Sequence, residues 1–223
     1  GAPLQAIALA SGAVLVRREW HREAPLLPLD LLRIPLLGLS MATSVTTFAA
    51  QMCALVSLPF LLQNVLGRTV AETGLMLTLW PLAVGVSAPL AGRLAERHHA
   101  GVLGGIGLFL FSAGLLALSL LGERPSTLDI GWRMALFGAG FGFFQSPNNK
   151  TILLTAPRHR SGAAGGMLAT ARLLGQTAGA ASVAAAFHWR GVGSGPLLLR
   201  AAALAALLAA TFSLLRLRVS VPG

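Results

Sequence analysis

Charged residues are scarce in this sequence, and acidic residues are the scarcest of them. Only 11% of the 223 residues are charged, with 7 acids against 17 bases. A soluble domain carries about 25% charged residues, so a chain that is 55% hydrophobic has too few of them to cover its apolar groups. The composition excludes an ordinary soluble domain and indicates a protein that crosses a membrane several times.

Cysteine occurs once, at Cys53, so an intrachain disulfide is excluded. Metal-ligand clusters, nucleophile elbows, phosphate-binding loops and dinucleotide fingerprints are all missing from the sequence. The apolar runs also lack the grouped His, Asp or Glu that an enzyme inside the membrane needs. We therefore expect a protein that is not an enzyme and that holds no metal and no cofactor.

The net charge of +10 does not indicate a nucleic-acid partner. The basic residues lie mostly between apolar segments, which is typical of cytoplasmic loops beside a lipid bilayer. The basic stretches are 17–33, 93–99 and 158–160, and Arg216 and Arg218 follow the last apolar segment. The positive-inside rule places these stretches and the C-terminus in the cytoplasm.

Six apolar segments are long enough to cross a bilayer as helices. Each has about 20 or more residues, the length that a hydrocarbon core of ~30 Å requires. They cover 35–62, 73–91, 101–121, 130–154, 162–187 and 196–215. We predict an all-α polytopic membrane protein with a six-helix transmembrane bundle over 35–216, a cytoplasmic loop over 17–34 and a cytoplasmic tail over 217–223.

A shorter apolar run precedes these six segments. Residues 3–16 reach only about 21 Å as a helix, and basic residues follow the run, whereas in a signal peptide they precede it. We interpret 1–16 as the end of a transmembrane linker helix whose start is missing, and expect the chain to be a fragment.

Polar side chains and glycines mark four of the six spans. In lipid such groups usually point toward other helices or water. They are Thr43, Thr47 and Gln51 in the first span; Thr78, Trp80, Pro81 and Ser87 in the second; Gly138, Gly142, Gln145 and Asn149 in the fourth; and Arg172, Gly175, Gln176 and Gly179 in the fifth. Polar residues are few in the third span, which has Ser112 and Ser119, and in the sixth, which has Thr211 and Ser213. We predict that those two are peripheral, and that the chain is an inverted repeat of three plus three helices beside a cavity.

Three stretches resemble the major facilitator superfamily of transporters. They are "GRLAERHHA" (92–100), "GAGFGFFQSPNNK" (138–150) and "SGAAGGMLATARLLGQTAGAA" (161–181). The first is similar to the family's motif between the second and third helices of each half, with Glu96 in place of aspartate and His99 where glycine is usual. Together they resemble the C-terminal half of the fourteen-span drug:proton antiporter branch, whose extra helices between the halves would account for residues 1–16.

The resemblance implies proton-driven multidrug efflux of hydrophobic, often cationic compounds across a bacterial inner membrane. Two six-helix halves would rock to alternate access, so the implied partners are the bilayer, the substrate, protons and the missing N-terminal half. A stand-alone six-span scaffold, or a homodimer of half-transporters, is the alternative. The resemblance also implies a gating role for the loop residues Gly92, Arg93, Glu96 and Arg97, which on charge alone are equally a solvated cluster.

Nine residues are candidates for lining the cavity or binding substrate. They are Thr47, Gln51, Trp80, Gln145, Asn148, Asn149, Lys150, Arg172 and Gln176. Arg172 lies near mid-depth, where an arginine costs at least ~2.5–3.5 kcal/mol; it acts in the transport path, or it is buried and bonded to carbonyls and Gln176. Lys150, the single lysine, faces the cavity or snorkels to the cytoplasm, and Trp80 contacts substrate or packs.

Four glycines are expected at close helix contacts, because small residues four apart let helices approach. They are Gly138, Gly142, Gly175 and Gly179. No span has an acid in its interior. Since proton coupling commonly uses a carboxylate inside the membrane, we expect the coupling acid in the N-terminal half.

Overall fold

The computed structural model describes residues 29–157 and 160–218, and these residues form helices joined by short turns. The six predicted spans are present. They are α2 (Pro35–Phe60, continued by the π-helical η2, Leu61–Val65), α3 (Val70–Leu94), α4 (Ala100–Ser119), α5 (Thr127–Thr155), α6 (Ser161–Arg190) and α7 (Gly195–Leu215). Short 3-10 helices cover Leu29–Arg33 (η1), Val192–Ser194 (η4) and Arg216–Arg218 (η5). The predicted end of a linker helix at 1–16 lies outside the described residues.

The helix boundaries follow local sequence signals. Thr69 and Glu72 form a reciprocal capping box at the start of α3, and the Ser126 side chain caps α5. α6 ends at Gly191, where φ is +74°, a conformation that glycine adopts without steric cost. These signals set helices of 20 to 30 residues with tight turns between them.

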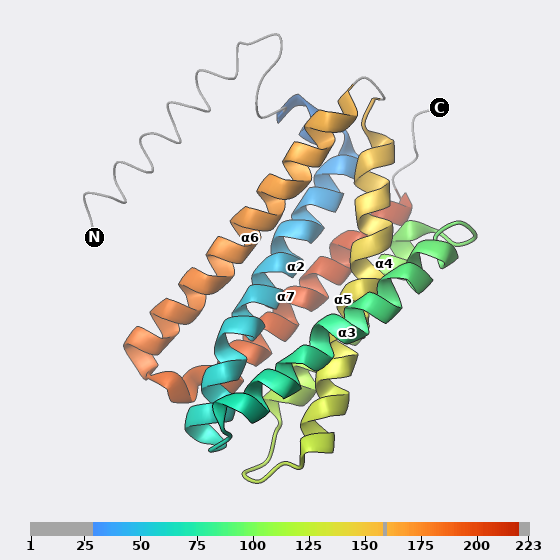
Figure 1. The fold of residues 1–223 in the computed structure, drawn as a ribbon. Helices are drawn as coiled ribbons and strands as arrows, with labels where there is room; N and C mark the ends of the chain where they lie inside the picture. The colour runs from blue at the N-terminus through green and yellow to red at the C-terminus, as the bar shows by residue number, and fades with distance from the viewer. Residues whose placement is uncertain (1–28, 158–159, 219–223) are drawn as a thin grey trace.

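The helices pack in a pattern that is unchanged when the first three exchange places with the last three. α2 packs against α6 and α7, α5 packs against α3 and α4, and α4 packs against α7. Replacing α2, α3 and α4 by α5, α6 and α7, and the reverse, reproduces the same list. Because each set has three spans, the second set runs through the bundle in the opposite direction. This arrangement agrees with the predicted three-plus-three inverted repeat (Figure 1).

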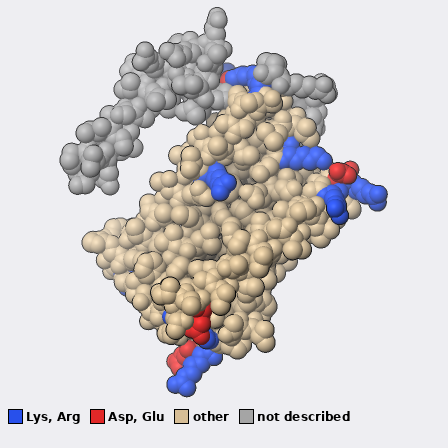
Figure 2. All heavy atoms as spheres, viewed as in Figure 1, with Lys and Arg blue, Asp and Glu red and all other residues tan. Residues whose placement is uncertain are grey.

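Four helical stretches are long and apolar enough to cross a membrane by length and composition alone: Pro35–Val65, Val70–Leu94, Ala100–Ser119 and Val192–Leu215. α5 and α6 contain more polar residues, but at 29 and 30 residues each reaches about 44 Å, and both lie alongside the others (Figure 1). Charged side chains gather mainly at the two ends of the bundle, and the flank between them is almost free of charge (Figure 2).

The prediction that the third and sixth spans are peripheral is wrong for packing within this chain. α4 is the most buried of the apolar helices and α3 the least, since α4 is held by α5 and α7 whereas α3 packs mainly against α5 alone. The polar residues of a span do not show how tightly that span packs against the other helices of this chain. The glycines of α4 at 101, 104, 105, 107 and 114 lie against its neighbours, since a Cβ at each would come within 3.0 Å of α5 or α7.

α4 and α5 approach each other closely through a pair of facing glycines. A Cβ added at Gly107 would meet the backbone of Phe143 and Phe144 at under 3.0 Å, and one at Gly140 would meet the backbone of Phe111. Small residues at such contacts allow the dispersion attraction that holds helices together in lipid. The α4–α5 pair therefore depends on the absence of two side chains.

We expect Gly140→Ala to destabilise the folded protein by about 1–3 kcal/mol, because the added methyl group forces two backbones apart. Gly85→Ala in α3 is the matched control, since nothing lies within 4 Å of its Cβ position. That change should be neutral or slightly stabilising. Thermal unfolding of the purified protein in detergent measures both, and equal midpoints for the two variants would contradict the close-contact argument.

Candidate functional site

The two edge helices, α3 and α6, leave broad faces uncovered. α3 exposes large apolar side chains at intervals of four or seven residues: Leu75, Leu82, Val86 and Leu90. α6 exposes Leu173, Leu174 and Trp189, and the exposed face of this helix also carries Arg172. We name the surface formed by these exposed faces of α3 and α6, with the exposed part of α5 between them, the open face.

Arg172 and Lys150 are the two candidates that the structure leaves exposed. The guanidinium of Arg172 lies over the ring of Phe48, 5.7 Å from its centroid, an arrangement in which the ring face attracts the cation. The interpretation of Arg172 as a buried arginine bonded to carbonyls and Gln176 is therefore wrong. Its side chain lies at the surface of this chain, against the buried ring of Phe48.

The remaining cavity candidates lie deeper. Thr47, Gln51 and Asn148 are buried, and Trp80, Gln145, Asn149 and Gln176 are partly buried. Trp80 packs 5.9 Å from Phe137 and 5.6 Å from Phe141, centroid to centroid. The structure therefore separates the nine candidates into an exposed pair, an intermediate group and a group that belongs to the interior.

Two buried polar atoms near this aromatic cluster have no hydrogen-bond partner among the described residues: Gln51 Oε1 and Trp80 Nε1. Gln51 lies one helical turn from Phe48, whose ring contacts that of Phe141. An unpaired buried polar group costs about 1–3 kcal/mol. Both atoms are therefore left unsatisfied inside the part of the chain that the structure describes.

Arg216 forms a buried polar cluster that sequence reasoning missed. Although we assigned it to a basic cytoplasmic end, only 1% of its surface is exposed. Its Nη1 donates to Asn148 Oδ1 at 2.7 Å and to Ser40 Oγ at 3.1 Å, and its Nη2 donates to Ser213 Oγ. Asn148 Nδ2 donates onward to Ser44 Oγ at 2.8 Å.

The cluster joins four helices at one end of the bundle. Ser40 and Ser44 belong to α2, Asn148 to α5 and Ser213 to α7, and Ser213 Oγ donates to the carbonyl of Gly101 in α4 at 3.1 Å. A signal was present in the sequence, because Ser213 precedes Arg216 by one turn in a helix whose only other polar residues are Arg200 and Thr211. The positive-inside rule counts such an arginine as a loop charge and does not show where its side chain goes.

Glycines at the predicted packing positions lie against neighbouring helices. A Cβ at Gly138 or Gly142 would meet α3 at under 3.0 Å, and a Cβ at Gly175 or Gly179 would meet the backbone of α2. Of the four residues predicted to share one side of the fourth span, Gly138 and Gly142 therefore face α3 and not an open cavity. Only the other two, Gln145 and Asn149, are partly exposed.

The predicted gating residues occupy the end of α3 and the turn after it. Gly92 lies in the last turn of α3 against α5, since a Cβ there would be 3.0 Å from Ser146 Oγ. The side chains of Arg93, Glu96 and Arg97 are exposed. The next helix begins at a cap formed by His99, whose ring accepts a bond from the Gly101 N–H at 3.3 Å. The turn is free to contact another surface.

An ion pair ties the segment before α2 to the link between α5 and α6. Both guanidinium Nη atoms of Arg160 bind the carboxylate of Asp30, one of them at 3.2 Å. This hydrogen bond holds the pKa of Asp30 below its ordinary value. The carboxylate is therefore ionised at neutral pH, and the stabilisation is lost only as the pH falls through that lowered pKa.

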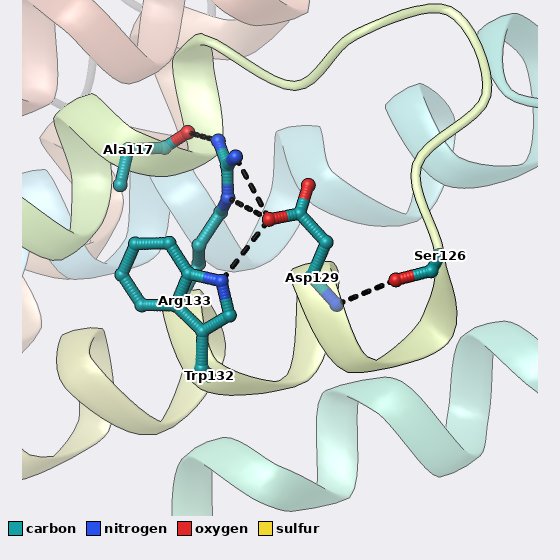
Figure 3. Close-up of polar contacts among 5 residues, drawn as sticks. All are labelled: Ala117, Ser126, Asp129, Trp132 and Arg133. Carbon is teal, nitrogen blue, oxygen red and sulfur yellow. Dashed lines mark hydrogen bonds and ion pairs between the residues drawn. The ribbon is translucent and has the colours of Figure 1, made fainter.

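At the opposite end, a second arginine joins α4 to α5 (Figure 3). Asp129 Oδ1 accepts bonds from Arg133 Nε at 3.0 Å, Arg133 Nη2 at 2.9 Å and Trp132 Nε1 at 3.0 Å. Arg133 Nη1 donates to the carbonyl of Ala117 near the end of α4. The guanidinium is thus held by a carboxylate of its own helix while it binds the neighbouring helix.

We expect Asp129→Ala to lower the free energy of unfolding by about 1–3 kcal/mol, because it leaves a largely buried guanidinium without its charged acceptor. Glu123→Ala, an exposed acid in the adjacent turn, is the matched control and should change stability by less than about 0.5 kcal/mol. Thermal unfolding in detergent compares them. A midpoint for Asp129→Ala that equals the control would show that the contact adds nothing to stability.

Comparisons with known proteins agree with this architecture. A family model described as Major Facilitator Superfamily matches residues 6–180. An uncharacterised transporter, YebQ of Escherichia coli, is 58% identical over 206 residues, which cover 92% of this chain and 45% of the relative. The multidrug resistance protein Stp of Mycobacterium tuberculosis is 34% identical over 167 residues (75% of this chain, 31% of the relative).

The riboflavin transporter RibZ of Clostridioides difficile is 30% identical over 169 residues, or 75% of this chain and 37% of the relative. The chain therefore spans less than half the length of these curated relatives.

Proposed function

The chain belongs to the Major Facilitator Superfamily, and from this premise we propose that it forms the C-terminal half of a proton-driven multidrug efflux transporter. Its substrates are hydrophobic compounds, often cations, and it exports them across a bacterial inner membrane by alternating access. A relative that is named a multidrug resistance protein and one that is named a riboflavin transporter support small-molecule transport.

The observation that carries the proposal is the exposed Arg172. It is the twelfth of the 30 residues of α6, so in a spanning helix it lies near mid-depth. A charge there costs at least ~2.5–3.5 kcal/mol if it faces lipid. The open face therefore needs water or protein in front of it, which a second six-helix half and the aqueous cavity between the halves provide. A six-span scaffold surrounded by lipid does not account for this exposed charge.

The charges of this half also constrain proton coupling. Among the described residues, the acids lie in the first turn of a helix or outside the long helices: Asp30, Glu72, Glu96, Glu123 and Asp129. Two exposed cations on the helices of the open face are Arg172, near the middle of α6, and Lys150, near the C-terminal end of α5. The carboxylate that exchanges protons, and that pairs with a cationic substrate, accordingly belongs to the N-terminal half, across the cavity from these bases.

We expect Arg172→Ala in the full-length transporter to reduce efflux of ethidium at least tenfold, because the mutation removes the one charge at mid-depth of this half. Arg200→Ala is the matched control, since Arg200 is an exposed arginine near the start of α7. Fluorescence of ethidium in cells at equal expression measures the rate. Wild-type efflux by Arg172→Ala would exclude Arg172 from the transport path.

The 223-residue chain by itself should not move ethidium against or along a pH gradient in liposomes, because it lacks the coupling acid and half of the cavity. The control is the full-length transporter in vesicles of the same lipid. Dye movement driven by the gradient in vesicles that hold only this chain would refute the assignment of proton coupling to the other half.

A further inference from the structure

We propose that Arg216 is a positioning residue that fixes the end of α5 and so keeps Asn149 and Lys150 on the open face. This inference rests on the proposed function only for the use of those two residues in transport. The positioning itself follows from contacts at the end of the bundle that carries the start of α2, the α3–α4 turn and η5, here named the basic end.

The side chain of Arg216 lies at a helix end, where it could extend into water, but it turns into the bundle. Arg216 follows the last residue of α7, and a long basic side chain at a helix end normally extends to water. Its guanidinium instead turns inward, makes bonds to three side chains and is almost fully buried. Burying a cation is costly unless its donors are satisfied, so the cluster is a specific arrangement and not a surface charge.

The space for the guanidinium is made by a glycine of α4. A Cβ at Gly104 would lie 2.7 Å from Ser213 Oγ and 3.1 Å from Arg216 Nη2. A larger residue at 104 would therefore displace the guanidinium. α4 forms one wall of the cluster, and α2, α5 and α7 supply its acceptors.

An anchor at this point stabilises α5 because Pro147 lies inside the helix and removes one of its backbone donors. Proline has no N–H, so the helix lacks the backbone bond that residue 147 would donate to Phe143, and such sites bend. The residue directly after the proline is Asn148. Its side-chain oxygen Oδ1 accepts a hydrogen bond from Arg216, and its side-chain nitrogen Nδ2 donates one to Ser44. Both polar ends of Asn148 are thus used to fix the helix just beyond its weak point.

The anchor determines which residues of α5 face outward. An α-helix turns by about 100° per residue, so Lys150 lies about 200° from Asn148, on the opposite side, and Asn149 lies between them. Asn148 is 1% exposed, whereas Lys150 is exposed and Asn149 is partly exposed. Ile152, one turn beyond Asn148, is fully buried. Holding Asn148 inward therefore holds Lys150 outward.

α2 and α5 touch each other only over a short stretch, and at the basic end they are joined by this anchor and by an apolar cluster that includes Leu37, Met41 and Ile152. Without the anchor, the segment after Pro147 keeps only the apolar contacts, which fix its rotation about the helix axis less strictly than directional hydrogen bonds do. The charge of Arg216 alone does not replace the anchor. A lysine at 216 offers a single nitrogen, which cannot reach Asn148, Ser40 and Ser213 together as the planar fork does.

The test measures cysteine reactivity in the full-length transporter in which Cys53 is replaced by alanine. Lys150→Cys reports an exposed position and Ile152→Cys a buried one, and the reagent is the membrane-impermeant cation MTSET. In the parent, position 150 should react much faster than position 152. With Arg216→Lys, we expect the ratio of the two rates to fall at least fivefold, because the segment rotates.

Two further variants separate the anchor from its charge. Asn148→Leu, which removes both bonds, should lower the ratio as Arg216→Lys does, and the double variant should be no worse than either single one. Asn148→Asp keeps an acceptor for the guanidinium and should preserve the ratio. Arg200→Lys in α7 is the control, and it should leave the ratio of the two reaction rates unchanged.

Three results would contradict the positioning role of Arg216 or the exposure of position 150. An unchanged ratio in Arg216→Lys would overturn the proposal. A second result would also overturn it. If Arg216→Lys raises the MTSET reaction rate of Leu115→Cys, a buried position in α4, as much as that of Ile152→Cys, general loosening of the bundle explains the change. If position 150 does not react in the parent, the open face of the proposed transporter fails, while the protection of position 152 still tests the anchor.

Discussion

A polar group inside a bilayer has no water to bind, and two arginines of this chain, Arg216 and Arg172, meet this constraint in different ways. Arg216 satisfies it inward, with hydrogen bonds from its guanidinium to acceptors on three helices. Arg172 satisfies it outward, since it is exposed and rests on the ring of Phe48. The first arrangement is explained by this chain alone, whereas the second requires water or protein beyond it. The internal packing and the open face are thus two solutions to the same requirement.

Most of the fold was predictable from the sequence, because its signals are strong and local. Six apolar runs of spanning length, separated by short turns, predict six helices, and each was found with boundaries within a few residues. The polar pattern also predicted a repeat of three helices, which the exchange of helix contacts supports. The relative depth of the helices was not predictable from polarity, because in lipid close packing depends on small residues such as Gly107 and Gly140 rather than on hydrophobicity.

The candidate site was less predictable, because a stripe on a helix shows which residues share a side and not what that side meets. Gly138 and Gly142 share a stripe with Gln145, yet the two glycines lie against α3. Asn148 and Lys150 are two residues apart, yet one is fixed inside the bundle and the other is exposed. The two long-range partners of Asn148, Arg216 and Ser44, are 68 and 104 residues away, and no local pattern connects it with either. Such pairings become visible only when the helices are assembled.

The two ends of the repeat show why a buried arginine is needed at one of them. At one end, α4 and α5 are consecutive, so their ends are joined by the chain, and Arg133 adds a bond to Ala117 with its charge balanced by Asp129. The exchange of repeats places α7 and α2 in the corresponding positions at the basic end. Those two helices are far apart in sequence, so no turn of the chain joins them. Helix packing and side-chain bonds make the connection there, and Arg216 adds a bond to Ser40 of α2 from the end of α7. The fold thus uses an arginine at both junctions: Arg133 is largely buried beside a carboxylate of its own helix, whereas Arg216, at the junction without a covalent link, is almost fully buried among neutral acceptors.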